Sequence, residues 1–257
     1  MLSKGKKLAE TTHTITIAKQ HLYYRSAGSG APLVLLHGYG VSGNVWQRCL
    51  PYLAQQCQVF IVDLPGHGHS KLAGGPWLLR EMAPLLAIWL RQMGLAPIAL
   101  MGHSMGGAIA IHLAAQAPDL VERLVLVNAA GMPLETRLPT LMARSIHSML
   151  QPKSGSYPWA LIRDVLKPRP RVLWQAAQEM VSSDFQAELA TITMPTLIIW
   201  GEHDVLLPLT RGQALSAALP HATFIKLPYS GHRPPLSQPE EFSRLVLEFL
   251  QEEQPCA

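Results

Sequence analysis

The chain has few cysteines and little charge, and each shortage excludes a class of protein. Its 257 residues include three cysteines, Cys49, Cys57 and Cys256, with no C-x-x-C spacing among them. This odd and small number excludes a scaffold held together by disulfides, and we expect free thiols. Charged residues make up 15% of the chain and hydrophobic residues 48%. This composition is typical of a globular protein and excludes intrinsic disorder.

Long apolar runs are also absent. No segment approaches the roughly 18 apolar residues of a membrane span, and residues 1–12 lack the apolar core of a secretory signal. We therefore expect a cytoplasmic protein that does not associate with membranes. The net charge is +4, but the basic residues are scattered, so no nucleic-acid partner is expected. The composition is compatible with a monomer or a homodimer.

The order of the apolar segments predicts an α/β protein with one helical insertion. Short strand-like segments alternate with longer segments of helical periodicity, which predicts a mostly parallel eight-stranded sheet with helices on both faces. The expected strands span residues 15–17, 22–25, 33–36, 59–62, 98–101, 124–127, 196–200 and 223–227. Between residues 132 and 187 prolines accumulate and the periodicity is helical. We therefore expect a core formed by residues 1–131 and 188–257, and an inserted helical cap formed by residues 132–187.

A glycine-rich turn joins the expected strand 98–101 to the helix that follows it. Its sequence is Gly102-His103-Ser104-Met105-Gly106-Gly107. So tight a turn needs small residues two places before and two places after the serine, and both are glycines. The turn presents the serine hydroxyl to a cleft, while the helix N-terminus favours developing negative charge. This context predicts that Ser104 is a nucleophile, and it disfavours an incidental serine in a glycine-rich turn.

A serine nucleophile needs a base, which an acid orients. Asp204 follows the expected strand 196–200, and His232 follows the expected strand 223–227. Both therefore lie at carboxyl ends of strands, where open α/β sheets place their sites. We expect Asp204 to be the acid, with Glu202 as the alternative, and His232 to be the base. The other histidines near the motifs are expected to be structural; they are His37, His67, His69, His103 and His203.

An oxyanion hole needs two fixed N–H donors. One is expected to be the backbone N–H of Met105, directly after the nucleophile, and the other that of Tyr39, in the loop after the expected strand 33–36. His67-Gly68-His69, near Asp63, lacks further ligands spaced to complete a metal site, so it indicates a loop that shapes the cleft. We expect neither a metal nor a cofactor.

In this order, the motifs resemble those of the α/β-hydrolase family, and they are most similar to its small, capped branch of serine hydrolases and carboxylesterases. The resemblance extends from about residue 15 to residue 249, with the cap as its least informative part. It implies an α/β-hydrolase fold and hydrolysis of carboxylic esters of small to medium acyl chain through an acyl-enzyme. The motifs are His37 to Gly40, Asp63 to Ser70, Gly102 to Gly107, Gly201 to Asp204 and Ser230 to His232.

Departures from the family's subgroups leave some alternatives open. Family dehalogenases and epoxide hydrolases carry an aspartate nucleophile, so Ser104 argues against both. Hydrolases of carbon–carbon bonds usually have asparagine before the serine, where this chain has His103. A vinylogous-diketone hydrolase or a lactonase stays an alternative activity. A hydrolase-like ligand receptor is the alternative of another class, and repeated turnover would exclude it.

The expected cap contains more basic than acidic residues. A basic lid would attract an anionic substrate or an acyl carrier protein. A solvated helical surface is the more ordinary interpretation, so we expect a small-molecule ester as the substrate and a carrier protein as the less favoured partner. The large apolar residues of this segment are candidates to line an acyl pocket, but residues at helical spacing more often form the core of a cap, so no role is assigned to them; they are Met132, Met142, Met149, Trp159 and Trp174. The basic residues are Arg137, Arg144, Lys153, Arg163, Lys167, Arg169 and Arg171, and the acidic ones are Glu135, Asp164, Glu179 and Asp184.

Overall fold

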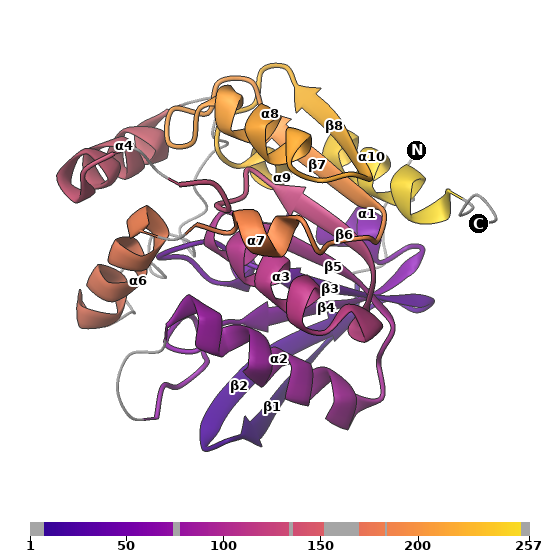
Figure 1. Ribbon diagram of the computed structural model, residues 1–257. Coiled ribbons are helices and arrows are strands. Elements are labelled where there is room, and N and C mark those ends of the chain that lie inside the picture. The colour runs from indigo at the N-terminus through magenta and orange to yellow at the C-terminus, as the bar shows by residue number, and fades with distance from the viewer. Residues whose placement is uncertain (1–7, 74–77, 134–135, 152–169, 183, 253–257) are drawn as a thin grey trace.

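The computed structural model describes residues 8–73, 78–133, 136–151, 170–182 and 184–252 (Figure 1). Its strands form a single eight-stranded sheet with the order β1-β2-β4-β3-β5-β6-β7-β8. β2 pairs antiparallel with both β1 and β4, and every other pairing is parallel. The predicted mostly parallel sheet is therefore confirmed. The strands are β1 (Glu10–Ile17), β2 (Gln20–Ala27), β3 (Ala31–Leu36), β4 (Cys57–Asp63), β5 (Ile98–His103), β6 (Val121–Val127), β7 (Thr196–Gly201) and β8 (Ala222–Leu227).

Helices cover both faces of the sheet, and each face has its own apolar cluster. Alternate residues of β3 point to opposite faces: Leu33 and Leu35 join one cluster, and Val34 and Leu36 join the other. One cluster includes residues of α2 (Leu79–Met93), α3 (Met105–Gln116) and α8 (Leu209–Ala217). The other includes residues of α1 (Leu50–Leu53) and α10 (Pro239–Gln251). Burial of side chains on both faces explains the nearly continuous apolar runs of these strands.

The parallel strands end at a common edge of the sheet. The pairing register sets Leu36 beside Gly102, His103 beside Val127, and Gly201 beside Leu227. The loops that follow β3, β5, β6, β7 and β8 therefore gather at this carboxyl edge. All the predicted site residues lie in these loops or at the start of α3.

The segment that connects β6 to β7 contains α4 (Leu138–Leu150), α6 (Pro170–Ser182) and the short α7 (Gln186–Leu189). Figure 1 shows α4 and α6 at one side of the molecule, away from the helices that flank the sheet. The predicted helical periodicity of this segment is confirmed for both helices. Its division from the core at residues 132 and 187 stays a prediction. Six of its charged residues lie outside the described residues: Glu135, Lys153, Arg163, Asp164, Lys167 and Arg169.

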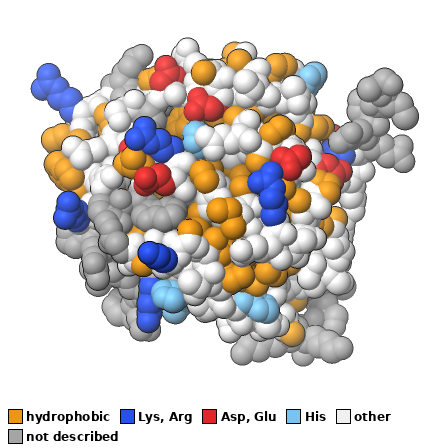
Figure 2. Space-filling view, turned by 60° about the horizontal axis from the view of Figure 1, so that its bottom comes forward, with side chains coloured by type: hydrophobic (Ala, Val, Ile, Leu, Met, Phe, Trp, Pro, Cys, Tyr) orange, Lys and Arg blue, Asp and Glu red, His pale blue; other side chains and the backbone are white. Residues whose placement is uncertain are grey.

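The sequence did not predict the shortest helical elements, which have too few residues to show a period. They are η1 (Gly43–Trp46), α1, η2 (Pro118–Leu120), α7 and α9 (Pro234–Ser237). Cys49 and Cys57 are buried free thiols, as predicted, and Cys256 lies outside the described residues. Within the described ranges, no helix is both long and apolar enough to cross a membrane. Figure 2 shows Lys and Arg side chains spaced apart over one face, with acidic side chains between them.

Candidate active site

Ser104 lies on a strained turn between β5 and α3. Its φ of 52° and ψ of −116° fall in a region that side chains disfavour, at a cost of about 1–3 kcal/mol. Two backbone hydrogen bonds hold it there: the Ser104 N–H donates to the Val127 carbonyl at 3.0 Å, and the Ala130 N–H donates to the Ser104 carbonyl at 3.0 Å. The end of β6 therefore fixes the serine, which is buried to all but 5% of its surface.

Close backbone contacts explain the glycines around Ser104. A Cβ atom on Gly106 would lie 2.5 Å from the carbonyl oxygens of both Leu36 and His37, which no side chain tolerates. A Cβ atom on Gly102 would collide with the Gly106 carbonyl. The steric requirement inferred from the sequence is therefore present in the structure, and the atoms that impose it at Gly106 belong to β3 and the loop after it.

Asp204 and His232 are hydrogen bonded to each other. His232 Nδ1 lies 2.7 Å from Asp204 Oδ2, and both side chains are almost completely buried. An ionised carboxylate only accepts hydrogen bonds, so Nδ1 carries the proton and Nε2 is left as the basic nitrogen. Asp204 Oδ1 accepts the backbone N–H groups of Leu206 at 2.8 Å and Leu207 at 2.9 Å. The carboxylate is thus fixed in position from both of its oxygens.

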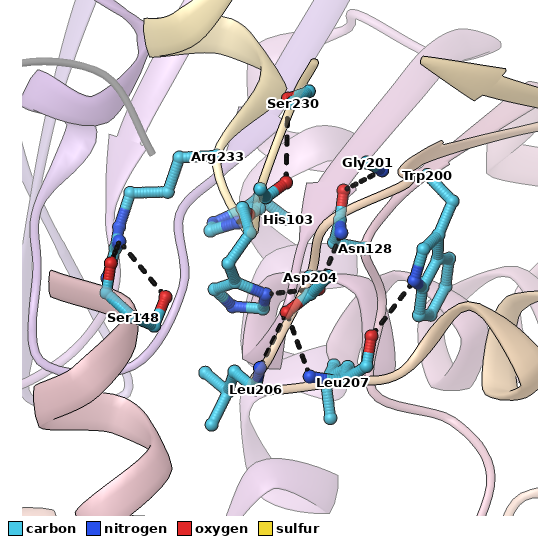
Figure 3. A network of polar contacts seen from close by, with 12 residues as sticks. His103, Asn128, Ser148, Trp200, Gly201, Asp204, Leu206, Leu207, Ser230 and Arg233 are labelled. Carbon is cyan, nitrogen blue, oxygen red and sulfur yellow. Dashed lines mark hydrogen bonds and ion pairs between the residues drawn. The ribbon is translucent and has the colours of Figure 1, made fainter. Parts of the chain in front are cut away.

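Asn128, which the sequence analysis missed, completes this network. It follows β6, is fully buried, and has a φ of 40°, a conformation that asparagine tolerates better than most residues. Its Nδ2 donates to Asp204 Oδ2 at 2.5 Å, and its Oδ1 accepts the Gly201 N–H at 3.2 Å. Figure 3 shows Asp204 between Asn128 and the N–H groups of Leu206 and Leu207. Its only signal in the sequence is a polar residue directly after a predicted strand, which by itself does not indicate its partner.

His103 supports the loop that carries His232. Its Nε2 lies 2.8 Å from the His232 carbonyl oxygen, to which it donates. Burial lowers the pKa of His103 well below its ordinary value, and the nearby His232 and Arg233 lower this pKa further, so the ring is neutral. Gly38 lies against this ring, because a Cβ there would approach His103 Nδ1 to 2.9 Å. These contacts agree with the structural role expected for His103.

The predicted oxyanion donors lie beside the serine. Met105 begins α3, and the first N–H groups of a helix have no acceptor inside the helix. Tyr39 follows Gly38, whose added Cβ would approach Ser104 Cβ to 3.2 Å, and burial raises the pKa of the Tyr39 phenol. Tyr39 and Ser104 line the same pocket, together with His232. The lining residues are Tyr39, Val41, His103, Ser104, Ala130, Leu141, Met180, Leu206, Leu207, His232 and Arg233.

The histidines of the two neighbouring loops make structural contacts. His37 Nε2 accepts the Leu64 N–H at 2.9 Å, and Asp63 accepts the N–H groups of Gly43 and His69 at 2.8 Å each. These bonds join the loop after β3 to the loop after β4. Among the residues that the structure describes, no three His, Cys, Asp or Glu side chains are grouped to hold a metal.

Glu202, the alternative acid, has a different partner. Its Oε1 pairs with Lys226 Nζ at 2.7 Å, and its side chain is 34% exposed. Asp204, in contrast, lies directly against His232. Of the two carboxylates near the end of β7, Asp204 therefore has the hydrogen bond that an orienting acid needs.

Comparisons with known proteins agree with this arrangement. The sequence profile described as "Alpha/beta hydrolase family" matches residues 33–245. The chain belongs to the alpha/beta hydrolase family. A pimeloyl-[acyl-carrier protein] methyl ester esterase of Chromobacterium violaceum is 32% identical, over 90% of this chain and 98% of the relative. The enzyme of the same name from Nitrosomonas europaea is 32% identical, over 86% of this chain and 96% of the relative.

Solved structures of other alpha/beta hydrolases share the fold. A thermophilic esterase from Thermogutta terrifontis superposes with a TM-score of 0.80 at 24% identity, covering 94% of this chain and 98% of that one. An esterase from Exiguobacterium antarcticum gives a TM-score of 0.84 at 20% identity, covering 94% of this chain and all of that one. The predicted fold and the expectation of an ester-hydrolysing enzyme are therefore confirmed.

Proposed function

We propose that this alpha/beta hydrolase is a serine carboxylesterase with Ser104, His232 and Asp204 as its catalytic residues. The observation that carries the proposal is the 2.7 Å bond between His232 and Asp204, in a pocket that Ser104 also lines. A buried carboxylate beside the imidazole fixes the tautomer that a general base needs and stabilises the imidazolium that forms. The strained turn holds the nucleophile on the wall of the same pocket.

The proposed reaction proceeds in two acyl-transfer steps. Ser104 Oγ attacks the ester carbonyl while His232 Nε2 takes its proton, and the backbone N–H groups of Tyr39 and Met105 stabilise the oxyanion. The carbon–oxygen bond to the alcohol then breaks, and His232 protonates the departing alcohol. Water attacks the acyl-enzyme with the same histidine as base, which releases the carboxylic acid and restores Ser104. No step requires a metal or a cofactor.

The preferred substrate that we propose is the methyl ester of a medium-length acyl chain carried on an acyl carrier protein. Relatives named for this activity align with nearly the whole chain at 28–32% identity. These matches favour the carrier protein more strongly than the charge of the predicted cap did. The exposed Arg137, Arg144 and Arg171, on or beside α4 and α6, supply charge of the sign that an acidic carrier needs.

The mechanism is tested with Ser104→Ala on a p-nitrophenyl ester of a short acid. We expect kcat to fall by at least about 10³-fold, because the nucleophile is lost while the other pocket residues stay. Mass spectrometry of the wild-type enzyme during turnover should show an acyl adduct on Ser104. Wild-type rates in the Ser104→Ala enzyme, purified free of other esterases, would refute the proposed mechanism.

The substrate is tested by comparing a carrier-bound acyl methyl ester with the free methyl ester of the same chain length. We expect a higher kcat/KM for the carrier-bound ester, and a loss of this difference at high ionic strength. A lactone and a vinylogous diketone, assayed in parallel, examine the two alternative activities. A single slow turnover on every ester would favour the ligand receptor, since an esterase cycles.

A further inference from the structure

Glu179 joins α6 to the core of the protein, and the proposed mechanism gives it no role. Its Oε2 accepts the backbone N–H of Leu79 at 2.6 Å, although the two residues are 100 positions apart. Leu79 is the first residue of α2, which packs against the sheet. Figure 1 shows α6 near the end of α2 at which this bond lies. The bond therefore connects a helix of the β6–β7 segment to a helix of the core.

The N-terminus of α2 needs acceptors from side chains. The first N–H groups of a helix have no partner in its backbone, and the residue before α2 is Leu78, whose side chain cannot accept a hydrogen bond. Two carboxylates take this role: Glu81 Oε2 accepts the Leu78 N–H at 2.7 Å, and Glu179 accepts the Leu79 N–H. Negative charge is also favoured at this end of a helix. The position of α2 therefore defines where the Glu179 carboxylate lies.

The groups that act on the Glu179 carboxylate belong to the core. Burial raises the pKa of this carboxyl, and the Leu79 N–H opposes the rise. Arg80 of α2 and His112 of α3 also lower this pKa, whereas Glu81 of α2 raises it. The carboxylate of α6 therefore lies against two core helices, and α3 is the helix that begins at the Ser104 turn.

Met180, the next residue of α6, lines the active-site pocket together with Ser104. It is 9% exposed, and like Ala176 it belongs to the apolar cluster of α2 and α3. Apolar contacts have no preferred direction, so they allow a helix to shift along the core. A hydrogen bond has a preferred direction and length. Because adjacent residues of a helix lie about 1.5 Å apart along its axis, the bond at Glu179 fixes Met180 as well.

We propose that Glu179 is a positioning residue: its bond to α2 holds Met180 in the pocket wall and thereby limits the length of the acyl chain that the pocket accepts. The inference rests on the proposed function, because the limit applies to the acyl chain of the ester. The proposed acid is fixed separately, by the hydrogen bonds around Asp204 at the sheet edge. Loss of the Glu179 bond therefore changes which esters bind and leaves the chemical step nearly unchanged.

The experiment measures the ratio of kcat/KM for p-nitrophenyl octanoate to that for p-nitrophenyl butyrate. In Glu179→Ala this ratio should rise at least about fivefold, mainly through a lower KM for the octanoate, while kcat on the butyrate stays within about twofold of wild type. Glu179→Gln keeps an oxygen acceptor for the Leu79 N–H, so its ratio should stay within about twofold of wild type. Met180→Ala should raise the ratio in the same direction as Glu179→Ala. Combining the two changes should add less than about twofold, because both remove the same wall.

Glu81→Ala is the matched control. It removes the other carboxylate from the N-terminus of α2 and leaves α6 unchanged. It should lower the melting temperature about as much as Glu179→Ala does, and its ratio should stay within about twofold of wild type.

Three results would overturn the inference. A wild-type ratio in Glu179→Ala would show that the bond does not set the pocket wall. Equal changes of the ratio in Glu81→Ala and Glu179→Ala would show that Glu179 only stabilises α2. Fully additive effects of Glu179→Ala and Met180→Ala would show that Glu179 does not act through Met180.

Binding without turnover separates this inference from the proposed function. Calorimetry compares butanoate and octanoate on Ser104→Ala and on the same protein with Glu179→Ala added. A preference that moves toward octanoate supports the inference even if the wild-type protein hydrolyses no ester. An unchanged preference overturns it even if esters are hydrolysed as proposed.

Discussion

The carboxyl edge of the sheet and the helices between β6 and β7 contribute to the same pocket, but they are constrained to very different degrees. At the sheet edge, Asp204 has four hydrogen-bond partners, and none of its side chain is exposed. Of the helices, α4 and α6 bury Leu141 and Met180 in the pocket wall, yet they leave Met142 46% and Trp174 53% exposed. The difference indicates that hydrogen bonds fix the side chains at the sheet edge, whereas α4 and α6 leave large apolar side chains partly in solvent.

The largest expected effect is on the acid at this edge. Asp204→Asn should lower kcat by about 10⁴-fold. An amide cannot accept hydrogen bonds at both of its terminal atoms, as the two carboxylate oxygens do, and it favours the wrong tautomer of His232. Steady-state kinetics on a p-nitrophenyl ester measures the loss. Glu202→Gln is the matched control, since Glu202 pairs with Lys226, and it should keep kcat within about twofold. Equal losses in the two variants would contradict the assignment of the acid to Asp204.

Removing the Asn128 amide should have the next largest effect. Asn128→Gly and Asn128→Ala both remove one of the two side-chain donors to Asp204 Oδ2 and leave only His232 Nδ1, at a cost of about 1–3 kcal/mol and with a clear loss of kcat. Glycine adopts the positive φ of this position more easily than alanine does, so the Asn128→Gly protein should have a higher melting temperature than the Asn128→Ala protein. Similar kcat losses in the two variants would assign the effect to the amide. Full activity of Asn128→Gly would show that the amide does not position Asp204.

Lowering the pH should reduce the free energy of unfolding by a smaller amount for each pH unit. Burial, together with a smaller effect of the neighbouring His37, lowers the pKa of His67 to about 3. The unfolded chain takes up this proton near pH 6.5, so stability is complete above that pH and falls toward pH 3. The loss from this group is up to about 1.4 kcal/mol per pH unit within that window.

Urea unfolding measured between pH 4 and pH 7 tests this dependence. His67→Asn keeps a donor for the Pro65 carbonyl but does not titrate, so its stability should fall less steeply on acidification. His147→Gln, at an exposed position of α4, is the matched control from the helical segment and should keep the wild-type slope. An unchanged slope in His67→Asn would contradict the prediction.

The smallest effect is expected on the exposed face of α6. Trp174→Ala should change the free energy of unfolding by no more than about 0.5 kcal/mol, since half of this side chain is already in water. The same substitution at the buried Trp89 of α2 should cost about 3–5 kcal/mol. Thermal melts of the two variants make the comparison. A large loss from Trp174→Ala would show that this face of α6 is covered.

Sequence reasoning succeeded where sterics or strand order leave few options. Ser104 was predicted from the glycines on both sides of it, and Asp204 and His232 from the strand that precedes each of them. In the structure, Ser104 and His232 line one pocket, and Asp204 is hydrogen bonded to His232. The sequence analysis missed Asn128, because a single polar residue after a strand belongs to no repeating pattern. Its hydrogen bond depends on a partner that is distant in the sequence, Asp204, 76 residues away.

In the helical segment between β6 and β7, the sequence predicted the helices but not their packing. Periodicity predicted α4 and α6 but not which of their residues are covered. Met142 and Trp174, to which the sequence analysis assigned no role, are both about half exposed, so neither is buried in the core of the helical segment. An amphipathic pattern identifies an apolar side of a helix. The neighbours that cover that side depend on how the helices are placed in space, which the pattern does not encode.

The turn at Ser104 also has a consequence for protein engineering. The carbonyl oxygens that exclude any Cβ from Gly106 come from Leu36 and His37, and the hydrogen bonds that hold the serine come from Val127 and Ala130. Grafting residues 102–107 onto another strand and helix would transfer the sequence without the contacts that hold its conformation. The peptide would relax to an ordinary turn, and the Ser104 hydroxyl would no longer point into a pocket. The conformation of Ser104 therefore depends on three adjacent strands, β3, β5 and β6, and not on residues 102–107 alone.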